Sequence, residues 1–126
     1  MTSEQLRKVS GGVIGHFTPK EIEVDAAKLA VSANTIGLKV PAHKFVVGAY
    51  IKNDADDLAS GGAATVKVTV GSTDVISATG LSDLKGKGVA MLDATPDYAA
   101  AEREVKLTVA TAAYTAGKLI VGVIYA

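Results

Sequence analysis

The side chains best suited to acid–base or nucleophilic chemistry are two histidines, and neither has a partner that the sequence can identify. His16 and His43 each lie beside a turn or a break, where surface histidines are far commoner than catalytic ones. There is no cysteine and no Gly-x-Ser-x-Gly motif to act with them. A serine–histidine–aspartate triad can be assembled on paper from any sequence, so it has no weight without geometry. The sequence therefore predicts no catalytic residue and a protein that is not an enzyme.

Two other segments resemble ligand-binding motifs but have the wrong spacing. Residues 53–63 contain three aspartates, yet counting from Asn53 or Asp54 gives neither the glycine at position six nor the glutamate at position twelve of a calcium-binding EF-hand loop. Residues 86–88 form Gly-Lys-Gly, but a phosphate-binding loop requires glycine where Leu81 stands and Ser or Thr where Gly88 stands. Both segments are expected to be loops, and the sequence predicts no metal site and no cofactor.

Composition excludes several classes of function. The 126 residues correspond to one domain, and 13 basic residues balance 13 acidic ones, so nucleic acid is not an expected partner. No run of about 18 apolar residues and no signal-peptide core occur, which predicts neither membrane insertion nor secretion. Only 21% of residues are charged and none is cysteine, so stability must come from burial and self-assembly. The chain is expected to remain in the cytoplasm unless a larger assembly carries it out.

The fold is predicted to be organised around the last stretch, residues 104–126. Val105, Leu107 and Val109 alternate with polar or small residues, which is typical of a strand with one buried face. Residues 118–125 are apolar on both faces, with Ile120 and Ile124 opposite the leucine and valines. These two strands are expected to form the hairpin that closes the fold. The two-sided strand implies a second partner, either another sheet or another subunit.

Residues 44–52 have the same two-sided character. One face is predicted to carry Phe45, Val47, Ala49 and Ile51, and the other Val46, Gly48 and Tyr50. Both apolar strands contain one glycine, which often marks the close approach of another backbone or a large side chain. Both strands are therefore expected to lie centrally in the fold. Their excess apolar surface predicts an oligomer interface, whose candidate residues are Val46, Tyr50, Ile120 and Ile124.

The other segments complete an all-β assignment. Residues 64–70 alternate cleanly and return through a short turn as residues 74–78, which predicts a hairpin. Thr95-Pro96-Asp97 is a helix-opening sequence, so at most one short helix is expected, near 95–103. Residues 13–126 should form an antiparallel β-sandwich, jelly-roll-like or related. Residues 1–12 should form a separate N-terminal arm in which Leu6 and Val9 are the large apolar side chains.

The segments TIGLKVPAHKFVVGAYIKN, TVKVTVG and LTVATAAYTAGKLIVGVIY occur in this order between residues 35 and 126. In this order, and above all in the Thr-Ala-Gly-Lys turn at 115–118 followed by an apolar strand ending at Tyr125, the chain resembles small β-sandwich virion proteins of tailed bacteriophages. These are the head decoration, or cement, and head-fibre class. The resemblance implies a homotrimer that decorates or cements a capsid, with the major capsid protein as partner, in virions assembled in the host cytoplasm. It does not extend to residues 1–34, where Leu6 and Val9 are candidates for docking on a capsid.

Two alternatives remain open at this point. The first is a receptor- or glycan-binding tip of a phage fibre that uses loops 53–63 and 79–88, although these loops lack aromatic residues that could anchor a ligand. The second is a small hydrolase, which would require a deep pocket around His16 or His43 with carboxylates nearby.

Overall fold

A computed structural model describes the backbone of residues 18–126 and the side chains of residues 19–92 and 97–126. The arm at 1–12, with Leu6 and Val9, lies outside the described residues, and so does His16. The boundary between arm and domain therefore stays a prediction. Within residues 18–126, two short helical turns, η2 (Ala26–Lys28) and α2 (Leu81–Leu84), interrupt a series of strands. The strands are β1 (Thr18–Asp25), β2 (Ala33–Val40), β3 (Lys44–Lys52), β4 (Ala59–Ser60), β5 (Thr65–Val70), β6 (Thr73–Gly80), β7 (Gly88–Ala99), β8 (Arg103–Ala110), β9 (Tyr114–Ala116) and β10 (Lys118–Tyr125).

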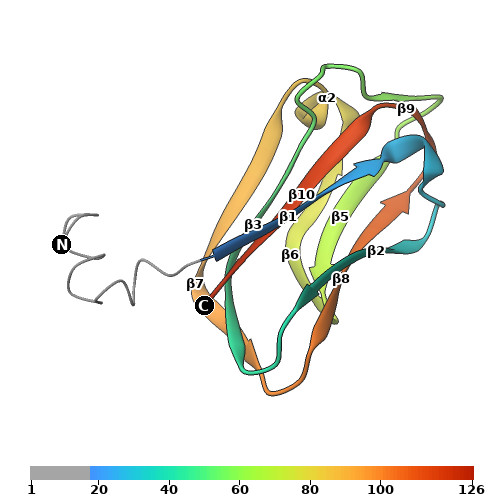
Figure 1. The fold of residues 1–126 in the computed structure, drawn as a ribbon. Helices are drawn as coiled ribbons and strands as arrows, with labels where there is room; N and C mark the ends of the chain where they lie inside the picture. Colours follow the sequence, from blue (N-terminus) through green and yellow to red (C-terminus); the bar gives the residue numbers. More distant parts are fainter. Residues whose placement is uncertain (1–17) are drawn as a thin grey trace, which may run out of the picture.

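The eight longer strands form two four-stranded antiparallel sheets, packed face to face (Figure 1). The first sheet has the order β1-β10-β3-β7, and the second has the order β2-β8-β5-β6. β4 and β9 form a small separate pair. Numbered one to eight along the chain, the long strands run 1-8-3-6 in one sheet and 2-7-4-5 in the other, which is the strand order of a jelly roll. The all-β sandwich predicted from the sequence is confirmed.

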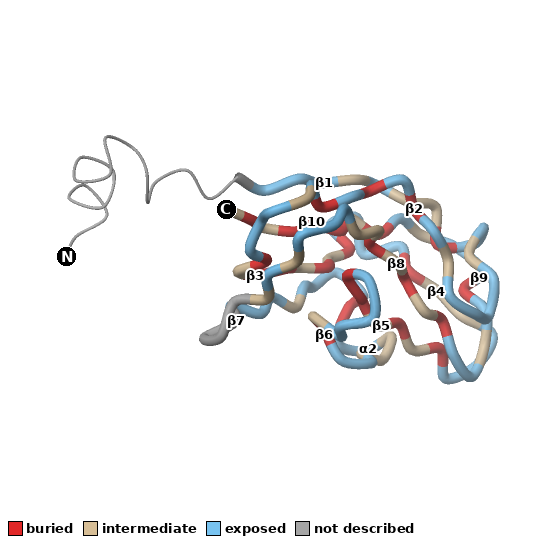
Figure 2. Tube along the Cα trace, turned by 90° about the horizontal axis from the view of Figure 1, so that it is seen from below, coloured by how far each residue is buried: buried red, intermediate tan, exposed pale blue. Residues whose placement is uncertain are grey.

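The core lies between the two sheets and is built from alternate residues of each strand. On β8, Val105, Leu107 and Val109 are buried while the residues between them are not. Figure 2 shows buried segments on strands of both sheets. On β10, the buried set is Leu119, Val121, Val123 and Tyr125. The predicted buried faces of β8, and of residues 66, 68 and 70 on β5, are confirmed, whereas the sequence left both faces of β10 apolar and did not decide between them.

β10 and β3 occupy the two central positions of their sheet, as their apolar character predicted. The expected hairpin between β8 and β10 is wrong, because β8 belongs to the opposite sheet. Instead, β10 pairs with β1 from Thr18↔Tyr125 to Asp25↔Lys118, so strands from the two ends of the sequence lie side by side (Figure 1). The predicted β5–β6 hairpin is confirmed, with Gly71 at φ 60° in its turn.

The helix expected near 95–103 is also wrong. Residues 95–99 belong to β7, and the short α-helix is Leu81–Leu84. β7 is an edge strand, and its pairing with β3 shifts register between Leu92↔Gly48 and Asp97↔Val46. Proline is tolerated at sheet edges and at bulges because no ladder hydrogen bond is then lost. The helix-opening sequence is thus accommodated within an irregular edge strand.

Within the part of the chain that the structure describes, no helix is long and apolar enough to cross a membrane.

Candidate functional surface

The outer face of the β1-β10-β3-β7 sheet carries an apolar surface crossed by one polar contact. Tyr50 on β3 lies opposite Gly122 on β10, which in turn lies opposite Glu21 on β1. The Tyr50 ring covers Gly122 so closely that a Cβ there would overlap it, and the Tyr50 hydroxyl donates a hydrogen bond to Glu21. Glycine is therefore required at 122 so that a ring from one neighbouring strand can reach a carboxylate on the other. This confirms the expected close approach of a large side chain.

The environment of Tyr50 disfavours its ionised form. Burial is the main cause, and the hydrogen bond to Glu21 and the negative charge of Glu21 add to it, so that the pKa of Tyr50 is raised from 10.0 to about 12. At neutral pH the hydroxyl is consequently a stable donor and does not act as an acid or a base. The Tyr50–Glu21 pair thus fixes the position of the Tyr50 ring on the surface.

Gly48 has a similar role one step along the sheet. A Cβ at this position would lie 2.9 Å from the carbonyl oxygen of Met91 and 3.0 Å from the Leu92 side chain. Ile124 contacts the same spot from β10 at 3.5 Å. The side chains of Ile124 and Leu92 therefore occupy the outer face beside Gly48, where a larger residue would displace them.

A β-bulge at Val47 changes which residues of β3 face outward. The pairing of β3 shifts between Val46 and Gly48 on both its neighbours. Val46 is consequently turned inward and is only 1% exposed, whereas Phe45 is 46% exposed. The predicted faces of Val46 and Phe45 are therefore wrong, because one extra residue reverses the alternation. Val46 therefore belongs to the core between the sheets and not to the outer face.

The bulge brings together an aromatic cluster, defined here as His43, Phe45 and Tyr98. The ring centroids of Phe45 and Tyr98 are 4.9 Å apart, and those of His43 and Tyr98 are 6.4 Å apart. Nδ1 of His43 lies 3.0 Å from the Tyr98 hydroxyl. His43 has φ 62°, the left-handed conformation of the turn between β2 and β3. All three rings are exposed, which gives the molecule an aromatic surface that the loops lack.

Exposed large hydrophobic side chains concentrate on β3 and β7. Among the described residues, five are markedly exposed, and four of them are Phe45, Met91, Leu92 and Tyr98. Leu92 is 81% exposed, the highest of the set. The fifth, Val31, lies elsewhere, between η2 and β2. Exposed apolar side chains gathered on two neighbouring strands are typical of an interaction site.

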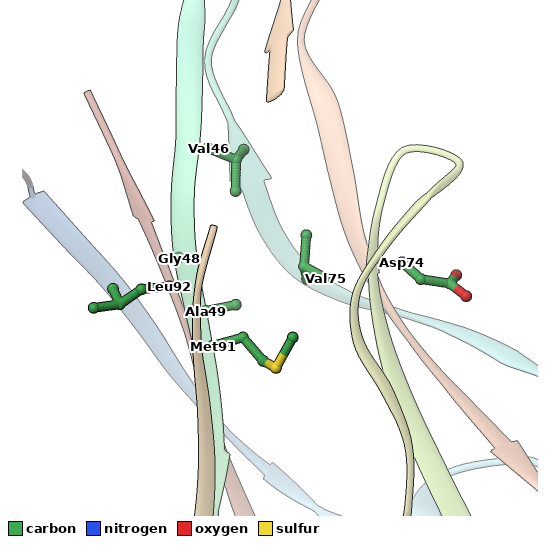
Figure 3. Close-up of a pocket in the computed structure, with 7 residues that line it drawn as sticks. All are labelled: Val46, Gly48, Ala49, Asp74, Val75, Met91 and Leu92. Carbon is green, nitrogen blue, oxygen red and sulfur yellow. The ribbon is translucent and has the colours of Figure 1, made fainter. Parts of the chain in front are cut away.

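A cavity of about 240 Å³ opens beside the same strand, between β7 of one sheet and β6 of the other. Its lining is mainly apolar, and the residues are Val46, Gly48, Ala49, Asp74, Val75, Met91 and Leu92. Figure 3 shows Met91 and Leu92 pointing to opposite sides of β7, with Met91 directed toward Val75 and Asp74 of β6. The cavity is therefore a groove between two strand edges.

Two ion pairs within the chain lie near this surface. Arg103 bonds to Asp97 at 2.5 Å and also donates to the carbonyl oxygen of Lys44 at 3.2 Å. On the β1 side, Lys118 lies 3.8 Å from Glu23. The outer face is therefore apolar with a balanced rim, which suits a neutral partner better than a strongly charged one.

No catalytic or metal-binding arrangement is found in the described residues. They contain no group of three or more histidine, cysteine or acidic side chains that could hold a metal ion. His43 contacts Tyr98 and does not line the groove. In the aspartate-rich loop, Asp57 accepts a hydrogen bond from Asn53, and Asp54 lies 3.4 Å from Lys52. The acidic loop is held by contacts within the chain.

Three of the four predicted interface residues share the outer face. Tyr50, Ile120 and Ile124 are half-buried there, whereas Val46 is not part of it. Sequence reasoning missed Phe45, Leu92 and Tyr98. The apolar run at 89–92 was a usable signal for Leu92, but nothing in the sequence marked the bulge that exposes Phe45.

The fold has close counterparts among solved structures. A chain from the capsid of Ralstonia phage GP4 is 22% identical with a TM-score of 0.57, and the match covers 88% of this chain and 83% of that one. A chain from the acid-stable capsid of Helicobacter pylori bacteriophage KHP30 is 15% identical with a TM-score of 0.58, and the match covers 86% and 85% respectively. No protein-family model matches the chain, and no curated protein matches it. At these identities the likeness establishes a shared fold.

Proposed function

We propose that this chain is a structural protein of a phage virion, without enzymatic activity, that decorates or cements a tailed-phage capsid as a homotrimer. The observation that carries the proposal is the fold likeness to chains from two phage capsids, each covering more than four-fifths of both chains compared. Jelly rolls are a common architecture of viral capsid domains, which agrees with this role. The resemblance found in the sequence of residues 35–126 points to the same class.

The outer face of the β1-β10-β3-β7 sheet supports the homo-oligomer. Tyr50, Ile120 and Ile124 lie there beside the more exposed Leu92 and Phe45. Symmetric oligomers bury apolar surface of this kind, and aromatic side chains are enriched in their interfaces. The proposed partner outside the oligomer is the major capsid protein, contacted by residues 1–12, with Leu6 and Val9 as the anchoring side chains.

Labelling of whole particles tests the location. Phage particles would be purified from a culture that produces this protein and labelled with gold-conjugated antibodies raised against it. Regularly spaced label over the head is expected, and a cryo-electron-microscopy map should show three-fold density on the shell. Label confined to the tail, or particles without the protein, would rule out capsid decoration.

A receptor- or glycan-binding fibre tip is the second candidate, and the aromatic cluster favours it. His43, Phe45 and Tyr98 form an exposed platform that can stack against a ligand. The matched pair for this test is the unchanged chain and its Tyr98→Ala variant, applied to a glycan array and to host cells. If the unchanged chain binds and Tyr98→Ala does not, the result supports a receptor- or glycan-binding fibre tip. If neither protein binds, the result favours the structural role in the capsid.

A further inference from the structure

We propose that residues 13–17 of a second copy of this chain add as a short strand to the free edge of β7 and fill the groove between β7 and β6, so that copies are linked head to tail in a closed ring. The inference rests on the homo-oligomer proposed above and specifies its contact. It assigns an occupant to the groove and a position to a segment that precedes the first described strand.

The acceptor is an edge with free backbone groups and an apolar border. From Gly88 to Leu92, β7 pairs with β3 on one side, and it is the last strand of its sheet. An edge strand presents unpaired N–H and C=O groups that can bond to an added strand. β6 is likewise the last strand of the opposite sheet, and the groove separates the two edges.

The groove offers two sides for the side chains of an added strand. Successive side chains of a strand point to opposite faces. One face would meet Val75 and Met91 in the groove, and the other would meet Leu92 on the outer surface (Figure 3). The segment that fills the groove should therefore carry apolar side chains on both faces of the added strand.

Residues 13–17, which read VIGHF, have this pattern. Val13 and Phe17 share one phase, and Ile14 has the other. The formal charge of the whole chain is zero, so the approach of a second copy meets no net repulsion. The segment matches the chemistry of the groove on both of its sides.

Chain length favours a neighbouring copy over the same copy as the source of the strand. The segment directly precedes β1, which is the edge of the sheet opposite β7. Three strand intervals separate these edges, about 14 Å, whereas five extended residues span only about 17 Å. Crossing the sheet within one copy would use nearly the whole segment and leave too little to pair along β7. A neighbour whose β1 lies beside this β7 requires no such crossing.

The arrangement also determines the symmetry. The donor surface is at β1 and the acceptor surface is at β7, so the contact joins two different patches. Contacts of this type close into rings when the rotation between copies permits, whereas a two-fold dimer uses the same patch on both partners. In a closed ring of three copies, as in the homotrimer proposed above, every donor segment and every acceptor edge is used.

Cysteine cross-linking tests the contact directly, because the chain has no cysteine of its own. Full-length His16→Cys and Ala90→Cys chains would be co-expressed with different tags and then oxidised. Ala90 is exposed on β7, so the substitution should leave the fold intact. A disulfide-linked product carrying both tags is expected. The matched control replaces Ala90→Cys with Val31→Cys, which is 52% exposed but lies away from β7, and should give no such product.

The double variant, with both cysteines in one chain, distinguishes the alternatives. Covalent oligomers up to the closed ring are expected. An internally cross-linked monomer would show that residues 13–17 bind to β7 of their own copy. A yield of cross-linked product no higher than in the Val31→Cys control would show that these residues bind elsewhere. Either result would overturn the proposal.

A charge placed in the groove provides a second readout. Met91→Asp should weaken self-association about a hundredfold, since a carboxylate would be buried against apolar side chains. Sedimentation velocity would measure this, with Val31→Asp as control. Unchanged association of Met91→Asp would refute the contact, even if particles are still decorated. A native chain that is monomeric yet decorates particles would instead refute the homo-oligomer and keep the capsid role.

Discussion

Tyr50 illustrates how single side chains determine the character of this surface. Its ring lies over Gly122 and its hydroxyl bonds to Glu21, so one residue spans three strands of the sheet. A second consequence is that the phenol closes a gap which would otherwise expose the β10 backbone. The contact depends on the absence of a side chain at residue 122.

Gly122→Ala is therefore expected to destabilise the fold. The new Cβ overlaps the Tyr50 ring, and either the ring moves and loses Glu21 or the strands separate. Overpacking of this kind costs about 1–3 kcal/mol. Urea unfolding followed by circular dichroism measures the change. Gly61→Ala is the matched control, because a Cβ there has no atom within 4 Å, and its effect should stay within about 1 kcal/mol.

The raised pKa of Tyr50 predicts a loss of stability at alkaline pH. The hydroxyl loses its proton near pH 10 in the unfolded chain but only near pH 12 in the folded one. The contribution of this group is thus fully present below pH 10 and is lost as the pH rises toward 12. The free energy of unfolding of the unchanged chain should fall more steeply across this range than that of Tyr50→Phe. The comparison removes the contribution of Tyr114, whose pKa burial also raises to about 12. Parallel curves would contradict the prediction.

At the scale of elements, faces were easier to predict than partners. Alternation identified the buried sides of β5 and β8 because burial follows the period of the strand. It could not show that β8 and β10 belong to different sheets, since pairing depends on the whole topology. Nor could it locate the bulge at Val47, which has no local sequence marker and decides that Phe45, not Val46, faces outward.

The helix expected at 95–103 failed for a related reason. Thr95-Pro96-Asp97 has a genuine preference for opening a helix, but the edge position of β7 and its register shift accept proline at little cost. Tyr98 is then presented on a strand, next to Phe45. Tyr98, one of the three members of the aromatic cluster, could therefore not be found from local preferences.

Asn53 joins three elements and should be important for stability. Its side chain is buried and donates to Asp57 at 2.8 Å and to the carbonyl oxygen of Lys118 at 2.7 Å, and it accepts from the N–H of Gly86 at 3.0 Å. Asn53→Ala removes three hydrogen bonds of a buried side chain and leaves two part-buried backbone groups without this partner, which should cost about 2–4 kcal/mol. Thermal and urea unfolding measure the loss.

The control for Asn53→Ala comes from the same loop. Asp54→Ala removes only an exposed ion pair with Lys52 and should change the stability by less than about 1 kcal/mol. If Asn53→Ala were equally mild, the three bonds could not be what holds this loop against β10 and the turn before β7.

At the scale of the whole molecule, the proposed roles are divided between segments. The sandwich should supply stability and self-association, and residues 1–12 should supply attachment to the capsid. Deleting residues 1–12 is accordingly expected to leave the melting temperature of the isolated oligomer nearly unchanged while abolishing its binding to capsids that lack it. Differential scanning fluorimetry and co-sedimentation with such capsids measure the two effects. A large drop in melting temperature would place the segment in the core, and retained binding would place the capsid contact on the sandwich.

The pairing of β1 with β10 has a consequence for the order of folding. β1 has β10 as its only neighbour in the sheet, and β10 also separates β1 from β3. The β1–β10 contact therefore joins residues roughly a hundred positions apart, and such distant pairings are slow because loop-closure entropy is lost first. We expect refolding on the millisecond-to-second scale typical of β-sandwiches. A chain interrupted before residue 118 lacks β10, so β1 and β3 each have an unpaired edge. Such a chain should aggregate, and a soluble product is expected only when β10 is present.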